Sequence, residues 1–202
     1  MEDDLLRNKI RRIYAALDAC EERDMSKLPA RVIESPGRIT LKQDFSGGAS
    51  PEELENDAHT LIHNIANIED VLLMWAKKNG HERTTVLGFR RGSEHLQVLK
   101  DLSNADKHGW PPWNDGHSGL APRLTGVHRE MILRTQPKGG STICITQSSN
   151  GSLMPLGDGE GLVVTTADII DRDGRQIGSL HEFCVAAIEV WESALAHFGI
   201  SI

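Results

Sequence analysis

Residues 50–80, SPEELENDAHTLIHNIANIEDVLLMWAKKNG, decide the fold because they form the clearest helical pattern in the chain. They open with Ser50-Pro-Glu-Glu53, which supplies an N-cap serine, a proline at the first helical position and a capping-box glutamate. Lys77 and Lys78 suit the negative end of a helix dipole, and Gly80 is a typical stop. Apolar side chains recur at helical spacing, at Leu54, Ala58, Leu61, Ile65, Ile68, Leu72 and Trp75. We therefore predict a core helix over residues 50–79.

Three further segments show the same periodicity. Residues 4–23 and 93–108 each place apolar side chains three and four positions apart. Residues 179–198 begin with a second capping box, Ser179-Leu-His-Glu182, and carry an apolar stripe that ends before Gly199. Together with residues 50–79, these segments predict a bundle of about four helices.

The remaining chain contains strand patterns. Residues 30–45 alternate β-forming residues around the turn dipeptide Pro36-Gly37, which predicts a hairpin. Residues 127–173 contain β-rich runs separated by glycine-rich turns. Because strands and helices do not alternate as parallel units require, we predict a mainly α (α+β) single domain over residues 1–202. In this prediction a small antiparallel β insertion lies between the third and fourth helices.

Composition and charge limit the classes of partner. The chain has 202 residues, of which 39% are hydrophobic and 25% charged, and its formal net charge is −7. These proportions are ordinary for a folded domain, and because of the negative charge we do not expect a broad basic surface for nonspecific nucleic-acid binding. Any contact with nucleic acid would therefore need a local cleft.

The sequence also indicates a cellular setting. No apolar run is long enough for a signal peptide or a membrane span, so we expect a cytoplasmic protein with no membrane partner. Cys20, Cys144 and Cys184 are odd in number and widely spaced, which fits neither a disulfide framework nor a zinc-knuckle pattern. We expect buried or idle thiols.

A polar strip ends the third helix, in the stretch DLSNADKHGWPPW of residues 101–113. Asn104, Lys107 and His108 share one helix face, and Lys100 precedes Asn104 by one turn. The strip is either solvated, with His108 bonded to the last helical carbonyls, or a site. In a site, His108 acts as acid or base near neutral pH, Lys107 offers charge to a phosphate, and Asn104 orients a group. These three are the candidate catalytic residues.

The second helix has its own polar face, on which His63, Asn67 and Asp70 follow one another at intervals of one turn. If the second and third helices pack antiparallel, the two strips line one groove, and His63, Asn67, Asp70, Asp106 and Trp110 are its candidate binding residues. The alternative is a solvated or dimer-facing stripe, with Trp110 as a packing aromatic rather than a base-stacking platform.

His59 and His63 have the spacing of a helical metal pair, but the glutamate of a metalloprotease signature is missing. A metal would have to recruit Asp106 or His108 as a third ligand. Since the sequence does not fix a third ligand, we predict no tightly bound metal and no cofactor.

Ser103-Asn-Ala-Asp-Lys-His108 resembles the Arg-Asn-x-x-x-His motif of the HEPN superfamily. Asn104 and His108 match, whereas Ser103 stands where the family has arginine. The resemblance implies a small helical domain that dimerises, in a superfamily that includes metal-independent ribonucleases whose arginine and histidine carry catalysis. A neighbouring basic residue would have to replace the missing arginine, the candidates being Lys107, Arg83, Arg90 and Arg91.

Two functions from different classes follow. The first is a HEPN-like noncatalytic interaction or ligand/RNA-binding module of bacterial type, which the acidic balance and the missing arginine favour. The alternative, implied by the resemblance, is a metal-independent HEPN-like endoribonuclease in a defence or toxin-antitoxin system. The expected partners are a second copy of the chain and RNA or a nucleotide, with a protein partner as a further option.

Overall fold

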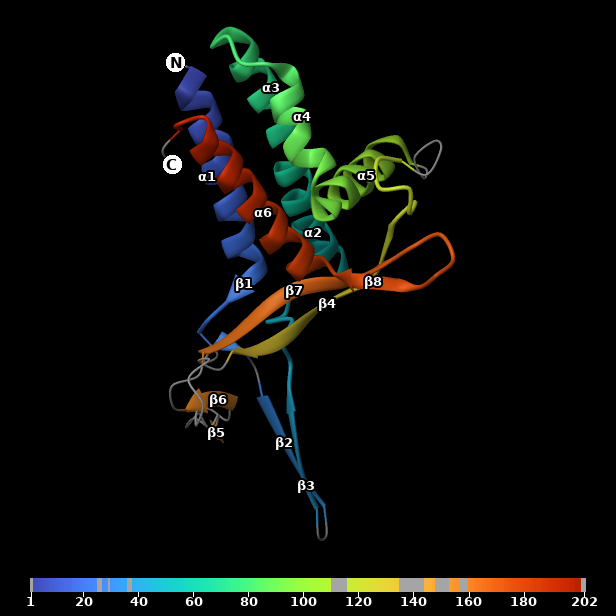
Figure 1. The fold of residues 1–202 in the computed structure, drawn as a ribbon. Helices are drawn as coiled ribbons and strands as arrows, with labels where there is room; N and C mark the ends of the chain where they lie inside the picture. The colour runs from blue at the N-terminus through green and yellow to red at the C-terminus, as the bar shows by residue number, and fades with distance from the viewer. Residues whose placement is uncertain are drawn as a thin grey trace.

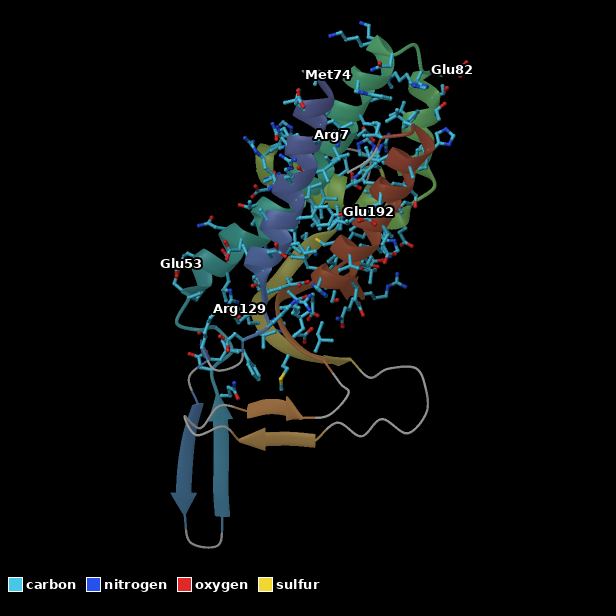
Figure 2. All side chains as sticks on the ribbon, turned by 90° about the vertical axis from the view of Figure 1, so that its left-hand side faces the viewer. Arg7, Glu53, Met74, Glu82, Arg129 and Glu192 are labelled. Atoms are coloured by element: carbon cyan, nitrogen blue, oxygen red, sulfur yellow. The ribbon has the colours of Figure 1, made fainter. Side chains whose placement is uncertain are left out.

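The protein is an α+β fold in which helices lie on one side of an antiparallel sheet (Figure 1). The computed structural model describes residues 2–24, 27–28, 30–35, 38–109, 116–134, 144–147, 153–156 and 160–200. Side chains from the helices fill the space between them and the sheet (Figure 2). None of the described helices has the length and apolar character needed to cross a bilayer.

The predicted helical regions are all helical in the structure. In chain order the helices are α1 Glu2–Cys20, α2 Pro51–Ala66, α3 Ile68–Lys78, α4 Arg83–Arg91, α5 Glu94–His108 and α6 Leu180–His197. The two serines proposed as N-caps, Ser50 and Ser179, accept hydrogen bonds from the backbone N–H three residues later, and Ser93 caps α5 in the same way. Gly109, with φ +71°, ends α5 in the left-handed conformation that glycine adopts most readily.

The predicted helix over residues 50–79 is interrupted at Asn67, which separates α2 from α3. The cause lies on another helix. Lys100 Nζ from α5 donates to the backbone oxygen of Ala66 at 3.4 Å, a carbonyl that an unbroken helix would give to the N–H of Asp70. A side chain that enters the hydrogen-bond ladder in this way bends or breaks a helix.

Helix α4 lies in a segment for which no helix was predicted. Among its nine residues only Val86 is buried, so its apolar periodicity is too weak to detect. A buried ion pair between Arg90 and Glu69 attaches α4 to α3. Tertiary contacts therefore determine α4 more than local pattern does.

A four-stranded antiparallel sheet has β7 at its centre. One edge of β7 Glu160–Ile170 pairs with β4 Arg123–Arg134, and the other pairs with β1 Glu21–Glu22 and β8 Gln176–Ser179. Helix α1 was expected to reach residue 23, but it ends at Cys20 because the next two residues pair with Val163 and Val164 of β7. The sheet therefore uses a strand from the N-terminal part of the chain.

Two smaller strand pairs accompany this sheet. The predicted hairpin is confirmed as β2 Ala30–Ser35 paired with β3 Arg38–Gln43, and it extends away from the helices (Figure 1). Its expected turn residues, Pro36 and Gly37, lie outside the described residues. The second pair joins β5 Cys144–Gln147 to β6 Leu153–Leu156, and both strands lie within the β-rich residues 127–173.

The strands lie mostly between α5 and α6, which are the third and fourth predicted helices, as expected, and the four-stranded sheet is also part of the core. Leu162, Val163 and Val164 of β7 are fully buried, and Ala167 and Ile169 belong to the same apolar cluster as the helices. Helices α1, α2 and α6 all contact β7. The expected insertion is thus one layer of the fold.

Cys20 and Cys184 are buried free thiols in this core, as predicted. Burial raises the pKa of the Cys20 thiol to about 12, and burial also raises the pKa of Cys184. Neither thiol is therefore a reactive thiolate near neutral pH. The side chain of Cys144 lies outside the described part of the structure.

Leu61→Ala should lower the free energy of unfolding by about 2–5 kcal/mol, because Leu61 is only 2% exposed and its truncation leaves a cavity in the main core. Chemical denaturation followed by circular dichroism measures this change. Leu5→Ala is a matched control, since Leu5 is 46% exposed and its loss should change stability much less. Equal midpoints for wild type and Leu61→Ala would remove Leu61 from the core.

Candidate functional site

The polar strips predicted on separate helices meet along the contact between α2 and α5. Lys100 near the middle of α5 reaches Asp70 at the start of α3, with Nζ 3.3 Å from Oδ2. Asp106, near the end of α5, reaches His59 and His63 earlier in the chain on α2. The two helices therefore run antiparallel, as the groove hypothesis requires, and several of their polar groups pair with one another.

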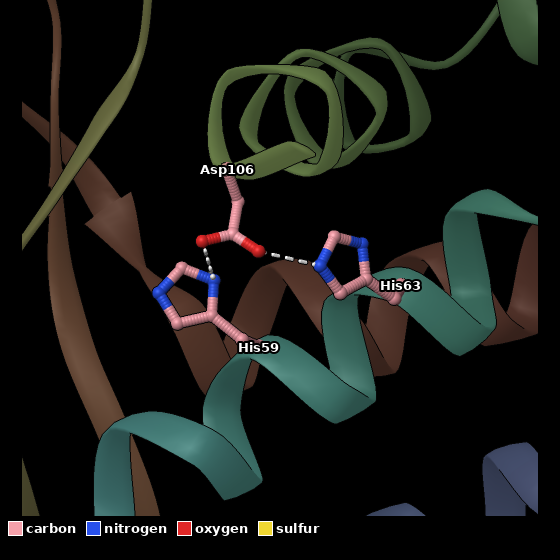
Figure 3. A group of neighbouring side chains, drawn as sticks. All are labelled: His59, His63 and Asp106. Atoms are coloured by element: carbon pink, nitrogen blue, oxygen red, sulfur yellow. Dashed lines mark hydrogen bonds and ion pairs between the residues drawn. The ribbon is translucent and has the colours of Figure 1, made fainter. Parts of the chain in front are cut away.

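His59, His63 and Asp106 form the densest polar cluster at this contact (Figure 3). The Nε2 atom of His63 lies 2.7 Å from Asp106 Oδ2, and the Nδ1 atom of His59 lies 3.5 Å from Asp106 Oδ1. The side chain of His63 is 24% exposed, that of His59 35% and that of Asp106 40%. Asp106 therefore stands between two imidazoles at the edge of solvent.

Ser103 extends this cluster into the protein. Its Oγ lies 2.8 Å from His63 Nδ1, which gives an unbroken chain from Ser103 through His63 to Asp106. The residue types are those of a Ser-His-Asp hydrolase, but there the imidazole uses Nε2 for the serine and Nδ1 for the carboxylate. Here the two ring nitrogens are exchanged, and Ser103 is fully buried, so a substrate carbonyl has no path to its hydroxyl. Ser103 therefore orients His63 instead of acting as a nucleophile.

A pocket of about 370 Å³ opens beside the cluster, between α2, α5 and the start of β4. His59 and Asp106 form one wall, and Arg123 stands among the residues of the β4 wall. Leu102 and Leu124 contribute apolar surface. Arg123 is exposed, and its guanidinium makes no hydrogen bond or ion pair with any residue in the described ranges. The pocket thus combines a free cation, a carboxylate, an imidazole and apolar surface.

The candidate catalytic residues do not converge on this cluster. Lys107 Nζ donates to Asn67 Oδ1 at 3.1 Å. Asn104 is half-buried and His108 is exposed, and neither side chain is hydrogen-bonded within the part of the chain that the structure describes. No hydrogen bond within the described residues therefore joins Asn104, Lys107 and His108 into one group.

The candidate binding residues are brought together in part. His63 and Asp106 are in direct contact, while Asn67 and Asp70 each pair with a lysine of α5. Trp110 lies outside the described residues. Among the basic residues proposed to replace the motif arginine, Arg90 is held by Glu69.

Ser103 and Arg123 were missed as site residues, and His59 was considered only as half of a metal pair. Ser103 and Asp106 are three apart on α5, a spacing that places them on one face and that indicates a shared partner. Arg123 follows a loop, so no local spacing relates it to α2 or α5. Only the fold reveals its position.

A second cavity, of about 590 Å³, lies at the connection between α3 and α4. Its lining includes the 59% exposed Met74 and the basic residues Lys77 and Arg83. His81, which also lines it, stacks on Trp75 with ring centroids 5.2 Å apart. Four ionisable residues line this cavity, Lys77, His81, Glu82 and Arg83, whereas the three ionisable side chains of the α2–α5 cluster contact one another directly.

No protein-family model, curated protein or solved structure matches the chain.

Proposed function

We propose that the protein is a noncatalytic HEPN-like binding module whose pocket between α2, α5 and β4 takes a nucleotide unit of single-stranded RNA. The observation that carries this proposal is that Arg123, which has no partner among the described residues, lines the same pocket as Asp106 and His59. A guanidinium is well suited to a phosphate, because its planar donors match two phosphate oxygens.

The other pocket groups suit the remaining parts of a nucleotide. Asp106 accepts hydrogen bonds from ribose hydroxyls or from an exocyclic base amine, and Leu102 and Leu124 offer apolar surface to a base. A volume of about 370 Å³ falls within the range of small-ligand pockets. Because the net charge is −7, binding depends on this local cleft and not on a basic surface.

The noncatalytic character is supported by the residue at the motif's arginine position. Ser103 is fully buried and bonded to His63, so no basic group projects from that position toward a substrate. Lys107, the nearest substitute, is hydrogen-bonded to Asn67. Neither position 103 nor Lys107 therefore offers an unengaged positive charge to stabilise a phosphodiester transition state.

Arg123→Gln should weaken binding of a short fluorescein-labelled single-stranded RNA about tenfold, which corresponds to roughly 1.4 kcal/mol from one lost charge-assisted contact. Fluorescence anisotropy at low salt, with chelator present, measures the dissociation constant. Arg12→Gln is the matched control, since Arg12 is exposed on α1 and carries the same charge. Absence of RNA binding by the wild type, or equal dissociation constants for both variants, would refute the proposed pocket.

The second candidate function is the metal-independent ribonuclease. The exposure of His108 favours it, because His108 precedes Gly109, a residue of the pocket, and its imidazole is open to an approaching strand. The homodimer implied by the family resemblance would strengthen this candidate if two copies of Asn104 and His108 faced each other. Light scattering on the purified protein, together with cleavage assays of His108→Ala in chelator, separates the two functions.

A further inference from the structure

The helical pair His59 and His63 has a third potential metal ligand in Asp106. One ligand atom from each of these three residues lies within 4.8 Å of the other two. The histidines come from successive turns of α2, and the carboxylate reaches them from α5 (Figure 3). Two imidazoles and one carboxylate favour a divalent first-row transition ion over magnesium or calcium, which prefer oxygen ligands alone.

The distances fit such an ion after a small movement of one side chain. In a tetrahedral zinc site with bonds of about 2.1 Å, neighbouring ligand atoms are roughly 3.4 Å apart. The separation of His59 Nδ1 from Asp106 Oδ1 is 3.5 Å, whereas His63 Nε2 is 2.7 Å from Asp106 Oδ2 and must move outward. Asp106 is 40% exposed, so its carboxylate has room to rotate.

His63 already has the outer contact that a metal-binding histidine needs. When a metal takes Nε2, the ring proton must sit on Nδ1 and find an acceptor. Ser103 Oγ lies 2.8 Å from Nδ1, and a hydroxyl can either accept or donate, so it serves both the metal-free and the metal-bound ring. The buried serine thus fixes the ring plane in both forms.

His59 supplies the second observation that points to a ligand. Its Nδ1 atom is buried and makes no hydrogen bond with any described residue, although it faces Asp106 Oδ1. A buried ring nitrogen without a hydrogen bond is costly unless something occupies it. An ion shared with Asp106 would satisfy this nitrogen.

We infer that His59, His63 and Asp106 form a site for Zn²⁺ with three protein ligands and an open position toward the neighbouring pocket. His59 and Asp106 also line that pocket, so a water or an anionic group of a ligand has access to the fourth position. This inference goes beyond the proposed RNA binding and does not depend on it. It also replaces the expectation of no metal, which was based on the lack of an evident third ligand in the sequence.

The experiment measures the metal alone, without RNA. Protein stripped with chelator and dialysed is titrated with Zn²⁺ against a chromophoric chelator, and wild type should bind one ion per chain. His63→Ala and Asp106→Asn should each weaken binding at least about 100-fold through loss of a direct ligand. His128→Ala, which removes an exposed histidine of β4, should leave the affinity unchanged.

Two further measurements distinguish a variant that fails to fold from one that folds but fails to bind zinc. Co²⁺ should give the visible bands of a four-coordinate ion in wild type, and Ser103→Ala should keep these bands while weakening affinity about tenfold. Zn²⁺ should raise the unfolding temperature of wild type but not that of Asp106→Asn, whose partly exposed site tolerates the change. No zinc binding by wild type, or the same affinity in folded Asp106→Asn as in His128→Ala, would overturn the inference.

Discussion

Asp101→Ala is expected to lower the free energy of unfolding by about 3–6 kcal/mol, although it removes only a carboxylate from a loop contact. Asp101 is fully buried on α5. Its Oδ1 accepts from the backbone N–H of His117 at 2.8 Å, and its Oδ2 accepts from the N–H and Oγ of Ser118 at 2.8 and 2.7 Å. In the variant these three donors lose their acceptor. Each lost hydrogen bond costs about 1–3 kcal/mol of folding free energy, and relaxation of the loop lowers the total.

Denaturant unfolding monitored by circular dichroism measures this effect. Asp18→Ala on α1 is the matched control, because Asp18 is exposed and its removal should change stability by less than about 0.5 kcal/mol. If Asp101→Ala unfolds at the same denaturant concentration as Asp18→Ala, the buried carboxylate does not hold the loop.

The contact between Asp101 and this loop requires a glycine at position 116 and helps to place one wall of the pocket. A Cβ at Gly116 would lie 2.4 Å from the Asp101 carboxylate, and the φ of Gly116 is +75°, so neither space nor backbone allows a side chain there. The loop held in this way leads into Arg123 at the start of β4. Asp101 thus connects the stability of α5 to the wall of the proposed binding site.

Local signals in the sequence predicted the helix starts well. The serine at the start of α2, α5 and α6 caps its helix through a bond to a backbone N–H three residues later, so the sequence itself contains both partners. The break at Asn67 was not predictable in this way. It depends on Lys100, which lies 34 residues from Ala66 and approaches it only after α5 has packed.

The antiparallel sheet was predicted in its place between the last two predicted helices, but its N-terminal strand and its burial in the core were not. Residues 21–22 show no strand pattern of their own, and they become β1 because β7 offers them a free edge. The burial of β7 also depends on helices from both ends of the chain, α1 and α6. Because the helices that bury β7 are distant in the sequence, the residues next to β7 do not show that it belongs to the core.

The sequence predicted which polar residues share a face of each helix, but not which of them meet between the two helices. The spacing of His59 and His63 indicated a shared face on α2, and Asp106 was already proposed as a partner. The direction of α5 decides which of its polar residues meet that face, and the motif residues Asn104 and His108 are not the ones that do. Instead Ser103 and Asp106 contact His63, so the motif's mismatched position is the structurally engaged one.

An arginine at position 103, as in the HEPN motif, should therefore destroy the fold and not create a ribonuclease. Ser103 is fully buried, and its Oγ contacts His63 Nδ1 at 2.8 Å. Ser103→Arg would place a long cationic side chain where the interior has space for a hydroxymethyl group. Overpacking and an unpaired buried charge together should cost more than about 5 kcal/mol, which is comparable to the whole stability of many domains.

Circular dichroism and thermal unfolding test this expectation, with Ser103→Ala as the control that keeps the volume and loses about 1 kcal/mol with the hydrogen bond. RNA cleavage is assayed in chelator for wild type and both variants, and none should cut, because position 103 supplies no cation in wild type or Ser103→Ala, Lys107 is hydrogen-bonded to Asn67, and Ser103→Arg should not fold. A folded Ser103→Arg that cleaves single-stranded RNA, with activity lost on adding His108→Ala, would contradict both the burial argument and the binding-module proposal. In that case α5 would have to present position 103 to solvent, and His63 would need another partner for Nδ1.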